Sequence, residues 1–270
     1  MLSDEPPQIR CTVEALPAGG RLARVTIDHR RRVNTLNTEL IAQLASLCER
    51  LQTDDELRCV VITGAGRAFC SGGDVKDIIG RLFGVSDEEL LAFTRMTCDL
   101  IENIRLLEVP VIASLNGTTC GAGAVIAAAC DLRLASEDAK IAFLFTQVGL
   151  SGADMGAAWL LPRIVGLAKA SELLMTGDFI SAEEAHRIGL YNRVVPDGEA
   201  LGAATQLAEK LARGPSFALE ITKDSLNREA SMDLAGALEA EAQIQAALMV
   251  HPDFREAYDA FVEKRSPDFL

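Results

Sequence analysis

Short apolar runs and amphipathic stretches alternate through residue 196. Two runs, at 59–63 and 109–115, are nearly uninterrupted in their apolar character, which is typical of strands buried on both faces of a sheet. Leu40, Leu44 and Leu47 recur at helical spacing and predict one buried helix face. By these criteria we expect strands at 24–28, 59–63, 109–115, 132–135 and 140–143, and helices at 37–51, 88–107 and 124–130. Strands and helices that alternate in this way predict an α/β core.

A second region, made of helices only, is expected after Pro196. Before it, Ser181 followed three residues later by Glu184 predicts a capping box at the start of a short helix, which Gly189 ends. Beyond Pro196, helical patterns follow one another at 200–212, 217–227, 232–249 and 253–264. The sequence therefore predicts a core at 1–196 and a helical region at 197–270.

The composition is that of an ordinary globular protein with an acidic balance. The chain has 270 residues, of which 49% are hydrophobic and 24% are charged, and this argues against intrinsic disorder. Lys and Arg number 26 and Asp and Glu number 39, which gives a formal net charge of −13. A chain this negative repels polyanions, so we expect neither nucleic acid nor an anionic membrane as its main partner.

Other features of the chain predict where the protein works. The longest apolar run, at 120–130, is shorter than the roughly 20 residues that a spanning helix needs. Met1 to Pro7 contain neither a basic nor an apolar segment, so no export signal is expected there. The seven cysteines form no C-x-x-C pair and only three histidines are present, which disfavours zinc and predicts reduced thiols in a cytoplasm.

Two glycine-containing turns are the best candidates for chemistry, because each follows a buried strand. Residues 71–74 (Ser-Gly-Gly-Asp) follow the strand at 59–63, and residues 121–123 (Gly-Ala-Gly) follow the strand at 109–115. Glycine lets a ligand approach the main chain closely, and N–H groups at the start of a helix carry partial positive charge. Two such groups aimed at one oxygen would form an oxyanion hole. The alternative is a pair of tight packing turns without a ligand.

Other catalytic and cofactor motifs are incomplete. The turn at 121–123 begins like a nicotinamide-dinucleotide loop, but Ile126 stands in place of the third glycine, and Lys140 and Ile141 lie where an acidic residue is needed. No G-x-S-x-G sequence is present, which disfavours a serine hydrolase of that type. The remaining candidates are expected to be structural or surface residues: His29, His186, His251 and Cys70.

Several motifs, in a fixed order, resemble those of the crotonase (enoyl-CoA hydratase/isomerase) superfamily. Residues 67–75 are similar to its first signature, and residues 110–117, 121–123 and 130–132 are similar to its second. Later landmarks of the superfamily resemble residues 160–166, 174–178, 189–195 and 261–265. The resemblance extends over about residues 10–265, and the ordered set is far more specific than any one motif.

The resemblance implies a crotonase-like α/β fold of stacked β-β-α turns, with a helical C-terminal region that builds homo-trimers, often paired into hexamers. It implies a coenzyme A thioester as the substrate, with no further cofactor and no metal. The main-chain N–H groups of Gly73 and Ala122 would hold the thioester oxygen. The nucleotide part would lie near Arg32, Asn34, Leu36, Asp74, Val75 and Lys76. Phosphate charge would be offset by Arg31, Arg32 or Lys76, unless these side chains are simply solvated.

The two glutamates that hydratases of this superfamily use are replaced in this chain. Their positions correspond to Val125 and Phe145, which cannot transfer a proton and are expected to line the acyl pocket. A third carboxylate position of the superfamily corresponds to Asp154, after a one-residue insertion. Asp154 is therefore the expected acid-base group. The alternative is that it caps the helix that begins near Met155.

With a single candidate carboxylate, double-bond isomerisation through a thioester enolate is the favoured reaction, because one base can remove a proton and return it. Hydration by a non-standard acid-base set is an alternative. Another is thioester hydrolysis or dehalogenation with Asp154 as the nucleophile. A third is a non-catalytic protein that binds CoA thioesters.

Overall fold

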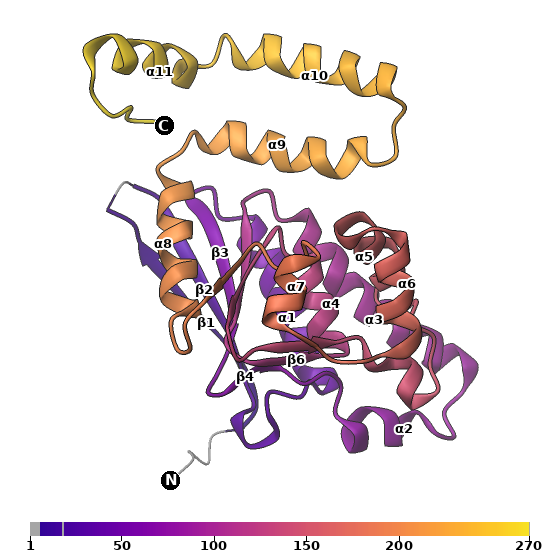
Figure 1. Ribbon diagram of the computed structural model, residues 1–270. Coiled ribbons are helices and arrows are strands. Elements are labelled where there is room, and N and C mark those ends of the chain that lie inside the picture. The colour runs from indigo at the N-terminus through magenta and orange to yellow at the C-terminus, as the bar shows by residue number, and fades with distance from the viewer. Residues whose placement is uncertain (1–5, 18, 270) are drawn as a thin grey trace.

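The computed structural model describes residues 6–17 and 19–269, which form an α/β core with a layer of helices beside it (Figure 1). The expected lack of an export signal concerns Met1 to Pro7, of which residues 1–5 lie outside the described residues. In the described part of the chain, no helix is both long and apolar enough to cross a bilayer.

The strands that the structure describes form two sheets. The larger sheet has the order β1-β2-β3-β5-β7-β10, antiparallel between β1 and β2 and otherwise parallel. The smaller has the order β4-β6-β8-β9, and only its β8-β9 pair is antiparallel. The strands of the larger sheet are β1 (Gln8–Ala15), β2 (Arg21–Asp28), β3 (Leu57–Gly64), β5 (Val111–Leu115), β7 (Leu132–Ser136) and β10 (Arg193–Val195). Those of the smaller are β4 (Ala68–Cys70), β6 (Thr118–Cys120), β8 (Lys140–Ala142) and β9 (Ile180–Ser181).

The sheets are built from a repeated β-β-α unit. β3 and β4 lead to α3, β5 and β6 lead to α4, and β7 and β8 lead to α5, so each unit contributes one strand to each sheet. This topology confirms the stacked β-β-α core that the resemblance implied. The α-helices of the core are α1 (Thr38–Gln52), α2 (Gly80–Leu82), α3 (Asp87–Leu106), α4 (Ala122–Ala129), α5 (Ala157–Val165), α6 (Leu167–Thr176), α7 (Ala182–Arg187) and α8 (Ala200–Ala212). Three short turns complete it: 3₁₀ turns at Arg30–Arg32 and Leu144–Val148 and a π-helical turn at Val75–Ile79.

The larger sheet is covered on both faces, which explains its apolar strands. In β3, Val60 and Ile62 pack into the main core, whereas Cys59 and Val61 pack into a second cluster that includes alanines of α8. Successive side chains of a strand point to opposite faces, so a doubly covered strand is apolar at most positions. This is why the runs at 59–63 and 109–115 identify β3 and β5 from the sequence alone.

The sequence pattern does not predict β1. This strand lies at the edge of the larger sheet, and most of its residues are exposed or only half-buried. Its position comes from antiparallel pairing with β2, which runs from Gln8 opposite Asp28 to Ala15 opposite Arg21. A partly solvated edge strand has little need of an apolar pattern, so no periodicity marks it.

The reciprocal capping box forms at α3 and not at α7. At α3, Ser86 accepts from the Glu89 N–H while the Glu89 carboxylate accepts from the Ser86 N–H. At α7, Ser181 accepts from the Glu184 N–H, but the Glu184 carboxylate binds Arg187 at 2.6 Å instead. The predicted bond from the Ser181 N–H to the Glu184 carboxylate is therefore wrong, because this carboxylate pairs with Arg187 instead.

The helices predicted after Pro196 are confirmed. α8 packs Ala204 and Ala208 onto the larger sheet and so belongs to the core by packing. The helices that follow are α9 (Ser216–Glu229), α10 (Leu234–Leu248) and α11 (Pro252–Glu263). They form the separate upper layer in Figure 1. The expected division of the chain at 196/197 stays a prediction. The packing of α8 on the larger sheet means that the helices outside the core begin with α9.

Gly123 in α4 is packed so closely against Cys70 that a side chain should not fit. A methyl group on Gly123 would lie 2.5 Å from the Cys70 carbonyl oxygen and 2.8 Å from its Sγ. We expect Gly123→Ala to lower the free energy of unfolding by about 1–3 kcal/mol, the usual effect of overpacking. Urea unfolding followed by circular dichroism measures this change.

Gly202→Ala is the matched control, because Gly202 also lies in a helix and a methyl group there would meet no atom within 4 Å. Helix propensity predicts that this variant is neutral or more stable by up to about 1 kcal/mol. Equal stabilities of Gly123→Ala and the wild type would contradict the packing argument.

Candidate active site

The two glycine turns singled out in the sequence lie in direct contact. A methyl group on Gly72 would lie 3.0 Å from the Cys120 carbonyl oxygen and 3.6 Å from the Ala122 nitrogen, and one on Gly121 would lie 3.5 Å from the Gly72 Cα. Both glycines have positive φ, +90° at Gly72 and +54° at Gly121, a backbone region that other residues rarely adopt. The structure thus brings Gly73 and Ala122 together although they are far apart in sequence.

The main-chain N–H groups of these two residues are not used by the fold. A parallel bridge joins Leu36 to Gly73, but its bonds run from the Leu36 N–H to the Gly72 oxygen (2.8 Å) and from the Asp74 N–H to the Leu36 oxygen (2.7 Å). Ala122 is the first residue of α4, where an N–H has no partner inside the helix. Among the hydrogen bonds of the described residues, none uses the N–H of Gly73 or of Ala122.

Asn34 and Leu36 support the first turn from inside. Both side chains are fully buried. The Asn34 amide donates to the carbonyl oxygens of Ala65 and Ala68 and accepts from the His29 N–H. These three bonds use the Asn34 side chain to link the loops around it. Since neither Asn34 nor Leu36 is exposed, each can affect a ligand only by supporting the turn.

Arg32 and Asp74 form an ion pair at the edge of the same turn. Arg32 Nη1 lies 2.6 Å from Asp74 Oδ2 and 3.1 Å from Asp77 Oδ2. Asp74 also accepts from the N–H groups of Lys76 and Asp77, and so begins the π-helical turn. Burial opposes the ionisation of Asp74, but these N–H groups and the Arg32 guanidinium outweigh it and lower the pKa of the carboxyl to about 2.

Two of the residues expected on the nucleotide side, Val75 and Lys76, lie on the surface beside this ion pair. Val75 and Lys76 are exposed, and no ion pair of Lys76 occurs among the described residues. The role of Asp77 was not evident from the sequence. A second acidic residue three positions after Asp74 is the signal that would have indicated a partner for Arg32.

Asp154 lies in the turn before α5 and faces α3. Its carboxylate is bonded by the N–H of Met155, a buried residue with φ +49°, and burial raises the pKa of Asp154 more than this bond lowers it. Burial and the charge of Asp154 also raise the pKa of the Cys98 thiol on α3. Cys98 could not be identified from the sequence, because only the tertiary fold brings α3 to this turn.

The alternative role of Asp154, as a helix cap, is not what the structure describes. The N-cap of α5 is Gly156, and no side chain bonds its first-turn N–H groups. The Asp154 carbonyl oxygen, not its carboxylate, accepts from Ala157 at 2.8 Å. Among the described residues, no hydrogen bond joins Asp154 to Gly73 or Ala122.

Val125 and Phe145 occupy the positions expected to line the acyl pocket. Val125 lies one turn after Ala122 in α4, and Phe145 lies in the 3₁₀ turn Leu144–Val148. Both are buried in the same core cluster, which also contains Met155. The environment beside the two turns is therefore apolar, and neither side chain can carry a proton.

The sequence pattern of the enoyl-CoA hydratase/isomerase family matches residues 18–270. The chain belongs to this family. It is 37% identical over 245 residues to 1,2-epoxyphenylacetyl-CoA isomerase of Escherichia coli K12, covering 91% of this chain and 93% of that one. It is 33% identical over 254 residues to a short-chain-enoyl-CoA hydratase of Clostridium acetobutylicum, covering 91% and 93%.

Solved structures agree with this assignment. A crystal structure from Streptomyces coelicolor A3(2), provisionally named an enoyl-CoA hydratase, matches with a TM-score of 0.92 at 45% identity and covers 100% of this chain and 98% of that one. The crotonase-like fold and the family are thus confirmed. The protein is an enzyme of the lyase or isomerase class.

The raised pKa of Asp154 predicts a pH-dependent stability. When the pKa of an acid is higher in the folded than in the unfolded protein, the protein loses stability as the pH rises through these two values. The reason is that burial disfavours the ionised form of the acid. The gain in free energy of unfolding of Asp154→Asn over the wild type should therefore be larger at pH 7 than at pH 3.5, which lies below the ordinary Asp pKa of 3.8. Urea midpoints at the two pH values measure this difference.

Asp178→Asn, at an exposed position, is the control and should show no such pH-dependent gain. A gain of the same size in both variants would show that the effect comes from net charge and not from burial of Asp154.

Proposed function

We propose that this enzyme binds a coenzyme A thioester and stabilises its enolate between the N–H groups of Gly73 and Ala122. The observation that carries this proposal is the pair of unused main-chain donors on two turns in contact. Removal of a proton next to a thioester places negative charge on the carbonyl oxygen, and two preorganised donors stabilise that charge. The start of α4 adds the positive end of a helix dipole.

The favoured reaction is double-bond isomerisation with Asp154 as the acid-base group. The ionised carboxylate takes a proton from one end of the allylic system, which gives a dienolate, and returns it to the other end. Burial raises the pKa of Asp154 and so brings this group closer to the range useful for proton transfer at neutral pH. Val125 and Phe145 replace the two glutamates with which hydratases of the superfamily activate water.

Other functions remain as outcomes of the experiment. The family contains both a hydratase and an isomerase among the relatives of this chain. Hydration would need a second proton-transfer group outside the usual positions. Hydrolysis or dehalogenation would use Asp154 as a nucleophile. A non-catalytic protein would bind the thioester without any proton exchange.

The nucleotide part of the ligand is proposed to lie along the first turn and the π-helical turn. Lys76 is the best candidate for a phosphate contact, because it is exposed and Arg32 is already paired with Asp74 and Asp77. Val75 would add apolar contact, while the buried Asn34 and Leu36 would contribute by supporting the turn. No other cofactor is needed for this chemistry. Seven free thiols support a reducing, cytoplasmic setting.

Deuterium exchange at the α- and γ-carbons of enoyl-CoAs in heavy water tests the proposal. We expect the wild type to exchange both positions and to move the double bond, and Asp154→Asn to lose about a hundredfold or more of the exchange rate. Asp178→Asn is the control for loss of one carboxylate elsewhere and should keep the wild-type rate.

Each other outcome of the exchange experiment has a distinct meaning. Exchange that persists in Asp154→Asn would remove Asp154 from the mechanism. Exchange accompanied by water addition would favour a hydratase. Release of free CoA would favour the nucleophilic reaction. Tight binding without exchange in the wild type would favour a non-catalytic protein.

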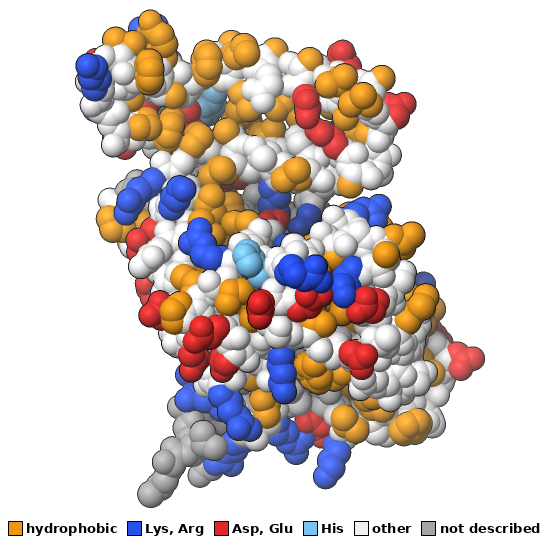
Figure 2. All heavy atoms as spheres, viewed as in Figure 1, with side chains coloured by type: hydrophobic (Ala, Val, Ile, Leu, Met, Phe, Trp, Pro, Cys, Tyr) orange, Lys and Arg blue, Asp and Glu red, His pale blue; other side chains and the backbone are white. Residues whose placement is uncertain are grey.

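The upper helices are proposed to form the contacts of a trimer or hexamer. Figure 2 shows apolar side chains gathered over α10 and α11. Val250 and Phe261 are 84% and 83% exposed, and Leu234, Phe254 and Tyr258 are also exposed. Apolar patches of this kind on a soluble chain usually mark protein interfaces.

Light scattering should therefore give a mass of three or six times 28.9 kDa. The pair Leu234→Glu and Phe254→Glu should shift the protein to smaller species, because charges at an apolar interface oppose association. Glu241→Gln, an exposed polar position on α10, should not. A monomeric wild type would contradict this arrangement.

A further inference from the structure

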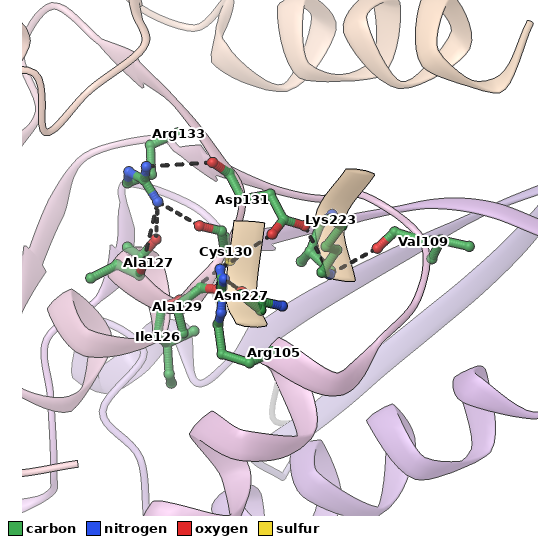
Figure 3. Close-up of polar contacts among 12 residues, drawn as sticks. Arg105, Val109, Ile126, Ala127, Ala129, Cys130, Asp131, Arg133, Lys223 and Asn227 are labelled. Carbon is green, nitrogen blue, oxygen red and sulfur yellow. Dashed lines mark hydrogen bonds and ion pairs between the residues drawn. The ribbon is translucent and has the colours of Figure 1, made fainter. Parts of the chain in front are cut away.

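The C-terminal end of α4 is held by two arginines from different parts of the chain (Figure 3). Arg133 Nη1 donates to the carbonyl oxygens of Ala127 (3.3 Å) and Cys130 (2.5 Å), and Arg105 Nη1 donates to that of Ala129 (3.2 Å). Helices usually end with carbonyls that need partners from outside the helix. Here two guanidinium groups supply them, and their positive charge suits the negative end of the helix dipole.

Apart from the close packing of Gly123 against Cys70, the side chains of α4 offer little to fix its position along its own axis. All eight residues are buried, and five of them are alanine with one glycine, so the helix surface has shallow ridges. Helices lock against their neighbours mainly by ridges that enter grooves. Hydrogen bonds at the two ends are therefore the stronger constraint. The Gly121 N–H, bonded to the Ala142 oxygen at 3.0 Å, holds the start, and the two arginines hold the end.

Arg105 is itself held by α9. Its guanidinium bonds Asn227 on α9 and lies 3.3 Å from Asp131 Oδ1. Lys223, buried on α9, donates to the Val109 oxygen at 3.0 Å and lies 2.9 Å from Asp131 Oδ2. Figure 3 shows these side chains converging on Asp131, the second residue after α4. The first helix outside the core is thus bonded to the far end of the helix that carries Ala122.

We propose that Arg105, held by Asn227 of α9, is a positioning residue for the oxyanion-hole donor at Ala122. Eight helical residues span about 12 Å, so α4 acts as a short rod whose two ends move together. Loss of the bond at Ala129 leaves this end held by Arg133 alone, and the looser end lets the Ala122 N–H shift relative to the thioester oxygen. This inference rests on the function proposed above.

Small misplacements of a donor reduce its effect on the transition state more than they reduce binding of the whole ligand. The nucleotide-side residues lie on the first turn and have no contact with Arg105 among those described. Arg105→Met should therefore lower kcat about ten- to a hundredfold and leave KM for the acyl-CoA within about twofold. Asn227→Ala should give a smaller loss in the same direction, and Arg105→Lys should recover part of it.

Arg95→Met is the matched control, because Arg95 is an exposed arginine on the same helix, α3, and should keep wild-type values. Light scattering must give the same mass for all variants, so that a change in assembly is not mistaken for a positioning effect. An unchanged kcat in a folded Arg105→Met protein would overturn the proposal. So would equal changes in kcat and KM.

A measurement without turnover separates this proposal from the proposed function. The ¹³C chemical shift of the thioester carbonyl of a bound saturated acyl-CoA reports how strongly the oxygen is polarised. We expect a downfield change on binding to the wild type and to Arg95→Met, and a clearly smaller one with Arg105→Met. The same change in all three proteins would overturn the positioning role alone. No change with the wild type would overturn the oxyanion hole, and the positioning role with it.

Discussion

The contact between the main-chain turns at Gly72 and Gly121 constrains the rest of the structure. A methyl group on Gly72 would lie only 3.0 Å from the Cys120 oxygen, and both positions have a positive φ that disfavours any residue but glycine. Buried main-chain N–H groups normally find partners, because leaving one unpaired costs about 1–3 kcal/mol. Two unused donors at one place are stable only where the surrounding structure holds them firmly, and that rigidity is what an oxyanion hole requires.

The β-β-α repeat explains how the two turns come together. Each turn follows one strand of the larger sheet and one of the smaller, and equivalent strands pair in parallel, so equivalent turns arise at the same edge. The donors are main-chain groups and do not depend on the side chains nearby. In our proposal this allows different proton-transfer groups to be placed around one enolate site. In this chain Asp154 takes that role in our account, while Val125 and Phe145 make the usual positions apolar.

The parts of the fold that the sequence predicts are those set by local pattern. Doubly buried strands such as β3 are apolar at most positions, and the glycines at 72 and 121 mark the turns that follow them. The edge strand β1 escapes prediction because partial exposure relaxes its pattern. The sequence predicts the order of the helices after Pro196. It does not predict that α8 packs on the sheet, because a helix face made of alanine can pack either on a sheet or on other helices.

The site is predictable to a lesser degree, because side-chain direction depends on tertiary contacts. Asn34 and Leu36 lie in the segment expected to hold the nucleotide, but both are buried, and Arg32 is paired with Asp77 as well as Asp74. The bonds that join Arg105 to Asn227 and Lys223 to Val109 link residues 122 and 114 positions apart, and they leave no local signal in the sequence. Motif order therefore locates the donors, whereas their support is visible only in the structure.

We propose above that the Ala122 N–H stabilises the thioester oxygen, and one substitution tests this directly. Proline is tolerated at the first position of a helix and has no N–H, so Ala122→Pro removes this donor with little effect on α4. Ala122→Gly keeps the donor and is its control. The account predicts that α-proton exchange in a bound acyl-CoA falls about a hundredfold or more in the proline variant and stays near the wild-type rate in the glycine variant. Wild-type exchange in a folded Ala122→Pro protein would contradict it.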